Sequence, residues 1–428
     1  MTVSAEQWWA APSAAAPVHG HIVVPASKSV TNRAVLLAAL AEGPGIVRNP
    51  LRSRDTDLMA AGLRVLGAEV TERPDGWAVT PGELHGPAAI DVGLAGTVMR
   101  FLPAVATLAR GAIRFDGDPR ARERPMTPLL ASLRRLGADV DDDGRGALPF
   151  TIQGTGDLPG GVVDIDASAS SQLVSALLLP AARWTSGVEV RHTGAMSVPN
   201  TPHLRMTAAM LRRRGVVVDD SDQGRWRVAA GAIAAVDDDV EPDLSSAAPF
   251  LAAAVVSGGS VTMRWPRNSH QPGALLPELL EQFGAKTQLV DDELTVSSAE
   301  VHGADLDLRD AGELTPVLAA VAAVASTPST FTGIGYLRGH ETDRLAALAR
   351  ELGALGGDVD VTDDGLTIKP GRLVGGRFST YDDHRLVMAA AVLGVVIPGI
   401  EIENAATVGK TFPGFVSEWT RIVVGGNG

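Results

Sequence analysis

Two interleaved patterns, each returning at intervals of about seventy residues, constrain the fold more than any other feature of this sequence. The first is a short polar cluster followed by a run rich in Ala and Leu, as where Lys28-Ser29 leads into residues 34–40. The clusters stand at Ser29, Gly96, Ser170, Ser245, Leu314 and Asp383. Successive positions are 67, 74, 75, 69 and 69 residues apart. Spacing of this kind is typical of repeated supersecondary units.

The second pattern is a helical segment that ends in Leu-Gly-Ala or a related sequence. Its glycines are Gly67, Gly137, Gly215, Gly284 and Gly353, in steps of 70, 78, 69 and 69. A glycine after a helix is typical of a left-handed C-terminal cap, and the β-branched residues that often follow predict strands. Chance spacing in an ordinary α/β chain is the alternative, but two series that keep step disfavour it. We therefore predict an α/β fold of six βαβαββ repeats, three in each of two lobes.

The boundary between the lobes is marked only weakly. The acidic segment 237–243 contains a proline and follows the third repeat. The first twenty residues precede the first repeat and can pair with the second lobe.

Composition excludes several classes of function. A net charge of −13 argues against nucleic acid or an anionic membrane surface as the main partner. The absence of cysteine excludes disulfides, thiolate metal sites and a cysteine nucleophile. Residues 1–20 lack the features of a secretory signal, and the longest apolar stretch, Val317–Ala325, is too short to cross a bilayer. We expect a soluble, cytoplasmic protein. No metal, ATP or dinucleotide motif is present, so we expect no metal and no cofactor.

Lysine is scarce, since 33 of the 37 basic residues are arginine. Two of the four lysines, Lys28 and Lys410, each introduce a segment that is predicted to begin a helix. A compact ammonium at a helix N-terminus, where free N–H groups and the dipole also attract negative charge, indicates an anion site.

Other helix starts also carry cations, which the dipole disfavours unless an anion compensates. Arg124 precedes Pro125, a predicted first helical residue, and a ligand role and a surface role are equally favoured for it. For Arg54, beside Asp55 and Asp57, a surface ion pair is the better interpretation.

Three further clusters allow a structural or a functional interpretation. Glu341 and Arg344 could simply pair on a helix surface. Asp383 could act as an N-cap, with His384 partly buried. In Ser170-Ser171-Gln172, N-capping accounts for one serine but not for the whole cluster.

Taken together, these segments resemble the EPSP synthase family. The resemblance covers residues 21–415, and seven short motifs occur in the family's order. They are Lys28-Ser29-x-x-Asn32-Arg33, Leu94-Ala95-Gly96-Thr97-x-x-Arg100, Arg124-Pro125, Ser170-Ser171-Gln172, Glu341-Thr342-Asp343-Arg344-Leu345, Asp382-Asp383-His384-Arg385 and Lys410-Thr411-Phe412-Pro413.

The resemblance implies the two-lobed enolpyruvyl transferase fold, an inside-out α/β barrel in which helix N-termini converge on a cleft between the lobes. One lobe would comprise 1–24 and 241–428 and hold acid/base and cationic residues that contact phosphoenolpyruvate. The other would comprise 25–240 and bind shikimate 3-phosphate. Lys28 and Lys410 would then lie in different lobes and meet one ligand only when the lobes come together.

The family's reaction moves the enolpyruvyl group of phosphoenolpyruvate to the 5-hydroxyl of shikimate 3-phosphate and releases phosphate, by addition and elimination through a tetrahedral intermediate. It serves aromatic amino acid biosynthesis. Such chemistry needs a tuned acid–base group, a base for the hydroxyl and many cations.

The resemblance also implies roles for individual residues. Catalysis would rest on Lys28, on Glu313 as the base for the hydroxyl, and on Glu341 as proton donor and acceptor. Phosphoenolpyruvate would be bound by Lys28, Gly96, Arg124, Gln172, Arg344, Arg385 and Lys410. Shikimate 3-phosphate would be bound by Lys28, Ser29, Arg33, Ser170, Ser171, Gln172, Ser197, Glu313 and His340.

Several positions depart from the commoner family pattern. His340 stands where Lys is frequent, Tyr336 where Asn is frequent and Glu313 where Asp is frequent. Leu94 and Phe101 replace a frequent Asn and Pro. His340 could make affinity depend on pH near neutrality, whereas Glu313 keeps the chemistry with a longer side chain.

Gly96 is retained, which predicts inhibition by glyphosate, a compound that resembles part of the phosphoenolpyruvate-bound state. Two alternatives stay open. The sister transferase that acts on UDP-N-acetylglucosamine shares the architecture, but it commonly uses a Cys acid, which this chain lacks. An inactive binding protein on the same scaffold is the other, although the complete set of cations and acids disfavours it. We expect a monomer that binds small molecules.

Overall fold

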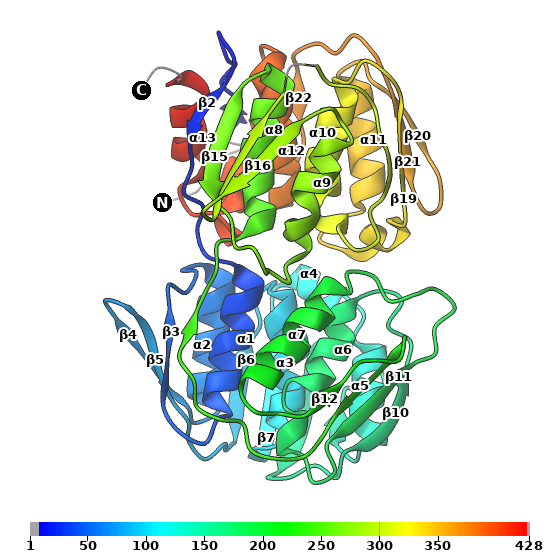
Figure 1. Cartoon of the computed structure of the whole chain (residues 1–428). Coiled ribbons are helices and arrows are strands. Elements are labelled where there is room, and N and C mark those ends of the chain that lie inside the picture. The colour runs from blue at the N-terminus through cyan, green and yellow to red at the C-terminus, as the bar shows by residue number, and fades with distance from the viewer. Residues whose placement is uncertain (1–7, 299, 426–428) are drawn as a thin grey trace, which may run out of the picture. The chain divides into compact units, whose positions relative to one another are not determined.

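The computed structural model describes residues 8–298 and 300–425, which form two units (Figure 1). One unit, here unit 2, comprises Ala26–Glu241, and the other, unit 1, comprises Met1–Pro25 and Pro242–Gly428. The chain therefore passes from one unit to the other twice. No described helix is long and apolar enough to cross a membrane.

Unit 2 contains three four-stranded sheets. In sheet order they are β14 (Asp238–Asp239), β3 (Gly45–Arg48), β5 (Gly76–Thr80), β4 (Glu69–Arg73); β6 (Ala88–Asp91), β7 (Arg110–Asp116), β9 (Phe150–Thr155), β8 (Asp139–Asp141); and β10 (Gly161–Ile165), β11 (Val188–His192), β13 (Arg225–Val228), β12 (Val218–Asp219). In each sheet the first two strands are parallel and the remaining pairs antiparallel. The same pairing scheme is thus used three times.

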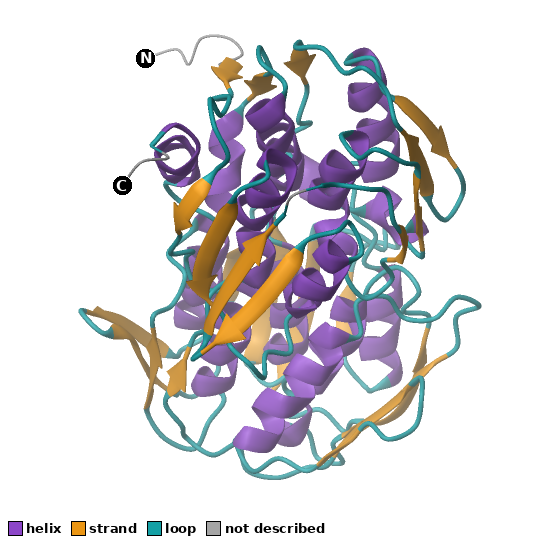
Figure 2. Ribbon diagram, turned by 45° about the horizontal axis from the view of Figure 1, so that its top comes forward, coloured by secondary structure: helices purple, strands orange, loops and turns teal. Residues whose placement is uncertain are grey.

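The helices of unit 2 divide into central and peripheral ones. They are α1 (Lys28–Ala39), α2 (Arg54–Val65), α3 (Gly96–Ala106), α4 (Pro119–Arg122), α5 (Thr127–Arg135), α6 (Ser171–Leu178), the 3₁₀ helix η1 (Ala181–Arg183) and α7 (Pro202–Arg213). The first helix of each repeat, α1, α3 or α6, is buried along nearly its whole length, because its sequence is apolar on all sides after the polar start. The second helices α2, α5 and α7 have one buried face. Figure 2 shows the sheets of the unit outside its helices.

Unit 1 also has three sheets, but one of them has three strands and not four. Its sheets are β2 (His19–His21), β15 (Ser260–Arg264), β17 (Glu293–Ser297), β16 (Lys286–Val290); β18 (Asp305–Asp307), β19 (Ser329–Thr332), β21 (Leu366–Lys369), β20 (Asp358–Val361); and the three-stranded β1 (Trp8–Ala10), β23 (Glu401–Glu403), β22 (Arg377–Phe378). The N-terminal segment supplies β1 and β2, so its pairing with the lobe that follows residue 241 is confirmed.

The helices of unit 1 follow the same division. They are α8 (Leu244–Ser257), η2 (Pro272–Leu275), α9 (Leu276–Glu281), η3 (Gly312–Leu314), α10 (Thr315–Ala323), η4 (Gly335–Gly339), α11 (Arg344–Ala354), α12 (His384–Val396), η5 (Ala405–Lys410) and α13 (Phe415–Val424). The central helices α8, α10 and α12 are again buried almost throughout. The predicted fold class is confirmed, with three repeats in each unit.

Three local predictions are wrong. Gly353 does not end its helix, because α11 continues to Ala354 and Gly356 is the residue with positive φ (94°). Pro125 is not the first helical residue, since α5 begins at Thr127. Lys410 does not begin a helix either; it ends the short helix η5.

Candidate functional site

The N-terminal ends of the three central helices of unit 2 lie side by side. One turn into α1, the Asn32 amide donates to Oγ1 of Thr97, in the first turn of α3, at 2.6 Å. One turn into α3, Arg100 Nη1 donates to Oε1 of Gln172, in the first turn of α6, at 2.7 Å. Three sets of N-terminal N–H groups and three helix dipoles therefore point at one region, which favours a bound anion there.

Arg33 supports this reading, because it is a buried cation whose partners are neutral. Its side chain donates from Nε to Thr207 Oγ1 (2.8 Å), from Nη1 to the Ser29 carbonyl (3.1 Å) and from Nη2 to Ser175 Oγ (3.2 Å). Burial lowers the pKa of Arg33 to about 9, which leaves it charged at neutral pH. None of these contacts in the described chain is to a carboxylate, so an anionic ligand would relieve an uncompensated charge.

Lys28 lies at the start of α1 and is partly exposed. Its Nζ is 3.2 Å from Oδ2 of Asp55, a buried residue in the first turn of α2. Arg54 forms a surface ion pair, as predicted, but its partner is Asp118 at 2.9 Å and not Asp55 or Asp57. The predicted partner was wrong because Asp55 turns inward to hold the lysine.

Two guanidinium groups surround the first residue of α3, Gly96. A Cβ atom at this position would lie 3.1 Å from Arg100 Nη1 and 3.3 and 3.4 Å from the two Nη atoms of Arg124. Arg124 lies between α4 and α5, where its backbone N–H donates to the Ala121 carbonyl. Only a residue without a side chain leaves both guanidinium groups in place at this helix N-terminus.

The serine cluster of α6 is ordered by capping. Ser170 is the N-cap and accepts from the Gln172 N–H at 3.2 Å, while Ser171 is buried. Ser168 Oγ donates to the Met196 carbonyl at 3.0 Å, which brings the exposed Ser197 close to the same helix start.

Unit 1 gathers a second set of predicted residues around Arg344. This side chain is 3% exposed and donates from Nε to Asp383 Oδ2 (2.7 Å) and from Nη2 to Asp383 Oδ1 (3.2 Å). Nη2 also donates to Glu341 Oε2 at 3.1 Å, so Glu341 and Arg344 do pair, but in a buried cluster rather than on a helix surface. Burial lowers the pKa of Arg344, but the nearby carboxylates, Asp383 first, outweigh burial and raise it above its ordinary value.

His340 adjoins this cluster. Its Nδ1 is 3.4 Å from Nη1 of Arg344. A guanidinium can only donate, so Nδ1 is the acceptor in this contact. Tyr336 packs on the same ring, with centroids 5.6 Å apart.

Glu313 lies in η3, directly before α10. Its Oε1 accepts a hydrogen bond from Ser245 Oγ, at the start of α8, and its Oε2 is 3.8 Å from Arg385 Nη2. Arg385 follows the N-cap Asp383, which accepts from the Arg385 N–H at 2.9 Å. A chain of contacts therefore runs from Glu313 through Arg385 and Asp383 to Arg344.

The predicted residues are divided between the two units. Unit 2 holds Lys28, Ser29, Arg33, Gly96, Arg124, Ser170, Ser171, Gln172 and Ser197. Unit 1 holds Glu313, His340, Glu341, Arg344, Arg385 and Lys410. Contacts between members of the two sets, such as Lys28 with Glu341, stay predictions.

Four residues with contacts in these clusters were assigned no role in the site from the sequence, although Thr97 and Arg100 stand in one of the family motifs: Asp55, Thr97, Arg100 and Ser245. A signal existed for Arg100, which stands four residues after Gly96 and so on the same helix face. Asp383 was assigned only a capping role, and its ion pair with Arg344 was not foreseen.

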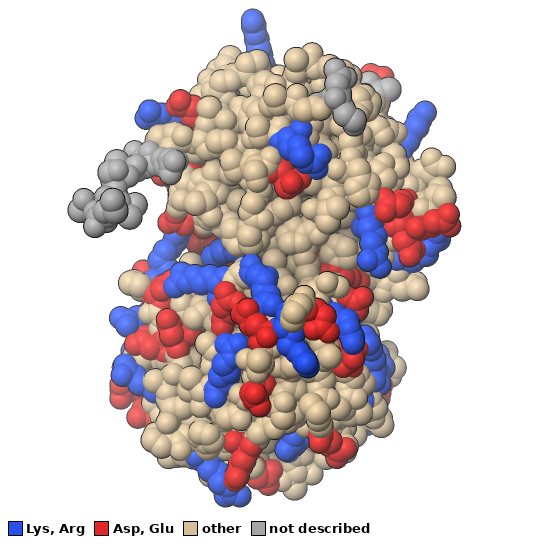
Figure 3. All heavy atoms as spheres, turned by 90° about the vertical axis from the view of Figure 1, so that its left-hand side faces the viewer, with Lys and Arg blue, Asp and Glu red and all other residues tan. Residues whose placement is uncertain are grey.

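In the part of the chain that the structure describes, no three His, Asp or Glu side chains form a group able to hold a metal ion. On the face shown in Figure 3, basic and acidic side chains of unit 2 alternate without an extended surface of one sign.

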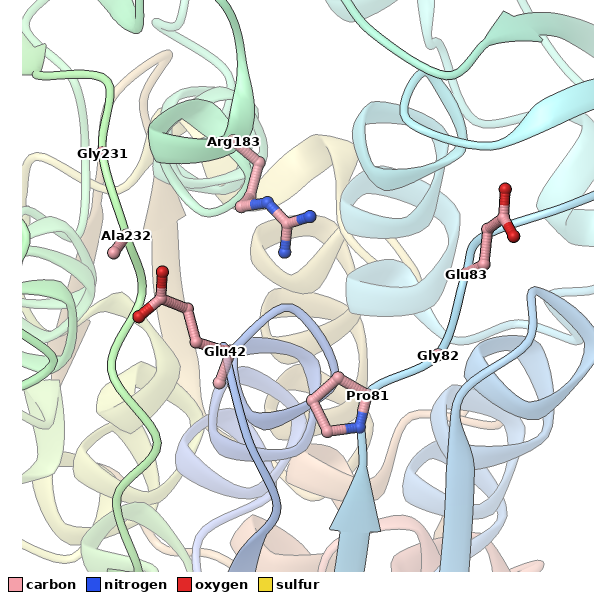
Figure 4. Close-up of a pocket in the computed structure, with 8 residues that line it drawn as sticks. Glu42, Pro81, Gly82, Glu83, Arg183, Gly231 and Ala232 are labelled. Carbon is pink, nitrogen blue, oxygen red and sulfur yellow. The ribbon is translucent and has the colours of Figure 1, made fainter.

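A cavity of about 790 Å³ in unit 2 lies away from these residues (Figure 4). Glu42, Glu83 and Arg183 line it, and Arg183 Nη1 donates to the Leu40 carbonyl at the end of α1. Lys28, at the other end of this twelve-residue helix, is about 18 Å away along its axis. The cavity is therefore separate from the anion-binding helix starts.

Comparisons with known proteins agree with this geometry. A sequence model of the family described as EPSP synthase (3-phosphoshikimate 1-carboxyvinyltransferase) matches residues 12–419. The chain is 51% identical to a 3-phosphoshikimate 1-carboxyvinyltransferase of Kocuria rhizophila, over 97% of this chain and 96% of that protein.

Solved structures show the same similarity. An EPSP synthase from Acinetobacter baumannii superposes with a TM-score of 0.80, 26% identity and coverage of 98% of both chains. The enolpyruvyl transferase NikO from Streptomyces tendae superposes with a TM-score of 0.76 over 97% of both chains, and its 18% identity indicates a common fold only.

Proposed function

Because the chain belongs to the EPSP synthase family, we propose that it transfers the enolpyruvyl group of phosphoenolpyruvate to the 5-hydroxyl of shikimate 3-phosphate and releases phosphate. The observation that carries the proposal is the cluster in unit 1, where Arg344 joins Glu341 to Asp383. A cation that fixes a carboxylate beside further cations suits a reaction that moves protons on a bound trianion.

Phosphoenolpyruvate would be bound by cations and a helix N-terminus. The residues assigned to phosphoenolpyruvate binding are Lys28, Gly96, Arg124, Gln172, Arg344, Arg385 and Lys410. The contacts that support this part are the two guanidinium groups around Gly96 and the buried Arg344. Hydrogen bonds from these guanidinium groups to an anionic substrate would be charge-assisted, and such bonds are stronger than neutral ones.

Shikimate 3-phosphate would be bound by Lys28, Ser29, Arg33, Ser170, Ser171, Gln172, Ser197, Glu313 and His340. The serines and helix N–H groups of α6 suit phosphate oxygens. Arg33 would act mainly as a buried charge, since each of its nitrogens already donates to the protein.

Glu341 and Glu313 would carry the proton transfers. For this role Glu341 must be protonated, a form that the negative charge of bound phosphoenolpyruvate favours. Glu341 then gives its proton to the methylene carbon of phosphoenolpyruvate, and the 5-hydroxyl adds to the electron-poor C2 while its proton passes to Glu313. Glu341 then takes a proton back from the new methyl group as the C–O bond to phosphate breaks. The departing phosphate takes up the proton that Glu313 received, so the carboxylates return to their starting states.

Phosphate release tests the proposal directly. Purified protein is mixed with phosphoenolpyruvate and either shikimate 3-phosphate or UDP-N-acetylglucosamine, and phosphate is measured over time. We expect turnover with shikimate 3-phosphate alone. Turnover with the nucleotide sugar instead would support the sister reaction, and none with either acceptor would support an inactive binding protein.

The assignment of the residues has its own test. The Lys28→Ala, Glu341→Ala double variant lacks a cation assigned to substrate binding and the proposed proton donor, so it should lose turnover. Undiminished turnover would refute the assigned site while leaving the reaction itself intact. The monomeric state also stays a prediction, which light scattering on the purified chain would check.

A further inference from the structure

The segment Ser379–Asp383, which joins β22 to α12, has an unusual backbone. Tyr381 and Asp382 follow each other with φ angles of 53° and 57°. This left-handed region is crowded for any residue with a Cβ, and Asn and Asp tolerate it best. Among the described non-glycine residues with positive φ, Tyr381 is the only one that is neither Asn nor Asp. Such a conformation persists only where surrounding contacts maintain it.

Helix α11 holds the segment from one side, at both of the helix's ends. Near its C-terminal end, the buried Glu351 accepts from the Ser379 N–H at 2.8 Å and from the Tyr381 hydroxyl at 2.5 Å. At its N-terminal end, Arg344 donates to both carboxylate oxygens of Asp383. The segment therefore cannot shift without moving α11 or breaking charge-assisted bonds.

Residues 403–407, which lead into η5, hold the segment from another side. The Thr380 N–H donates to Glu403 Oε2 at 3.0 Å. Asn404 Nδ2 donates to Asp382 Oδ1 at 2.7 Å, and Thr407 Oγ1 donates to the Asp382 carbonyl at 3.0 Å. Asp382 thus ties η5, the helix that ends at Lys410, to the start of α12.

Three elements that carry predicted ligand-binding cations meet at this one segment. Arg344 begins α11, Arg385 lies in the first turn of α12, and Lys410 ends η5. Arg344, Arg385 and Lys410 carry like charges, which repel and cannot hold one another in place, so their relative placement depends on what joins their elements.

We propose that Tyr381 and Asp382 are positioning residues for the enolpyruvyl transfer: their left-handed pair fixes Arg344, Arg385 and Lys410 relative to one another. This inference rests on the proposed function of those cations. Because shikimate 3-phosphate is assigned mainly to residues of unit 2, displacing the three cations should weaken the use of phosphoenolpyruvate and spare the binding of shikimate 3-phosphate alone.

The test compares Asp382→Ala with a matched control in the full-length enzyme. Alanine removes both the acceptor for Asn404 and the tolerance of positive φ. Asp291→Ala makes the same change at another left-handed aspartate of unit 1, φ 47°, in the turn between β16 and β17. Each variant is assayed for kcat/KM with phosphoenolpyruvate, for the Kd of shikimate 3-phosphate by calorimetry, and for its melting temperature.

We expect Asp382→Ala to lower kcat/KM for phosphoenolpyruvate by about ten- to a hundredfold, as small misplacements of binding groups do. The Kd of shikimate 3-phosphate should stay within about twofold of the wild-type value, because the variant keeps every residue that is assigned to binding this substrate. Asp291→Ala should lower the melting temperature in a similar way without changing either constant. Tyr381→Phe, which loses the bond to Glu351, should fall between wild type and Asp382→Ala.

Asp382→Asn provides the rescue, since asparagine tolerates the left-handed region and its Oδ1 can accept from Asn404. It should restore most of the lost kcat/KM. If Asp382→Ala is destabilised but keeps a normal kcat/KM, or if the asparagine variant is as impaired as the alanine variant, the positioning role is refuted. A wild-type enzyme without turnover would instead refute the proposed function.

Discussion

Arg344 and Asp383, 39 residues apart in sequence, form a buried ion pair in which two guanidinium nitrogens face two carboxylate oxygens. Asp383 is fully buried, and it also caps α12 by accepting from the Arg385 N–H. One carboxylate therefore neutralises a buried cation and fixes the helix that carries the next one. The ion pair therefore stabilises the fold and also supports a predicted binding site.

Replacing Asp383 should therefore be costly. Asp383→Ala leaves the Arg344 charge buried with Glu341 alone, and loss of one partner of a buried ion pair typically destabilises by about 3–5 kcal/mol. Urea unfolding monitored by tryptophan fluorescence would measure the change. Asp358→Ala, which breaks an exposed pair with Lys369, is the control and should leave stability unchanged. Equal stability of the two variants would show that Arg344 does not need its partner.

Ser245 should matter for turnover through Glu313. Its hydroxyl donates to Glu313 Oε1, so Ser245→Ala removes a hydrogen bond that positions the proposed base and leaves the ion pair with Arg385 in place. We expect kcat to fall by about tenfold with little change in KM for phosphoenolpyruvate. Ser245→Thr keeps a hydroxyl and should retain most of the activity.

The neighbouring serine is a matched control for this prediction. Ser246 is also buried at the start of α8, but its Oγ has no hydrogen-bond partner among residues 8–298 and 300–425. Ser246→Ala should therefore leave kcat unchanged, since a buried hydroxyl without a partner contributes nothing that is lost. Parallel losses in both serine variants would mean that general packing of α8, and not the bond to Glu313, sets the rate.

The repeats and the starts of the central helices could be predicted from the sequence because they depend on local patterns. An apolar run after a polar cap gives a buried helix whatever its neighbours, and Ser170 and Asp383 cap their helices as expected. The pairing of the N-terminal segment with the second lobe could also be predicted, because this segment precedes the first repeat and is not part of it. Gly353 misled because a second glycine, Gly356, stands within three residues.

The contacts that organise the clusters could not be predicted in this way. Lys28 with Asp55, Ser245 with Glu313 and Arg344 with Asp383 are separated by 27, 68 and 39 residues. Each depends on how two helices pack, and the nearest charge in sequence was the wrong partner for Arg54. The left-handed Tyr381 carries no sequence signal, because its conformation is imposed by Glu351 and its neighbours.

Stability at low pH should depend on Glu189 of β11. Hydrogen bonds from Arg225, then Arg227 and Arg191, lower its pKa from 4.5 to about 2. A lowered carboxylate pKa contributes stability above the unfolded-state value, and that contribution is lost as pH falls from about 4.5 to 2. Glu189→Gln should therefore be less stable than wild type at pH 7, and the difference should shrink towards pH 2. Melting curves between pH 7 and 2 would test this, and a constant difference would contradict it.

Gly96 should control the use of phosphoenolpyruvate. In Gly96→Ala the new Cβ would lie 3.1 Å from Arg100 Nη1 and 3.3 Å from Arg124 Nη1, so both guanidinium groups must shift outward by a few tenths of an ångström. We expect KM for phosphoenolpyruvate to rise by about tenfold, because the anion then meets the helix start and its cations at longer distances.

Inhibition by glyphosate should weaken in the same variant, since the proposed inhibitor complex uses the same groups, while millimolar glyphosate should inhibit the wild-type enzyme. Gly353→Ala is the control: this glycine lies within α11 with open space around its Cβ position, and alanine there should stabilise by about 0.5–1 kcal/mol without changing KM. A normal KM and unchanged inhibition in Gly96→Ala would show that Arg100 and Arg124 move aside at no cost, and that the glycine is not required for ligand binding.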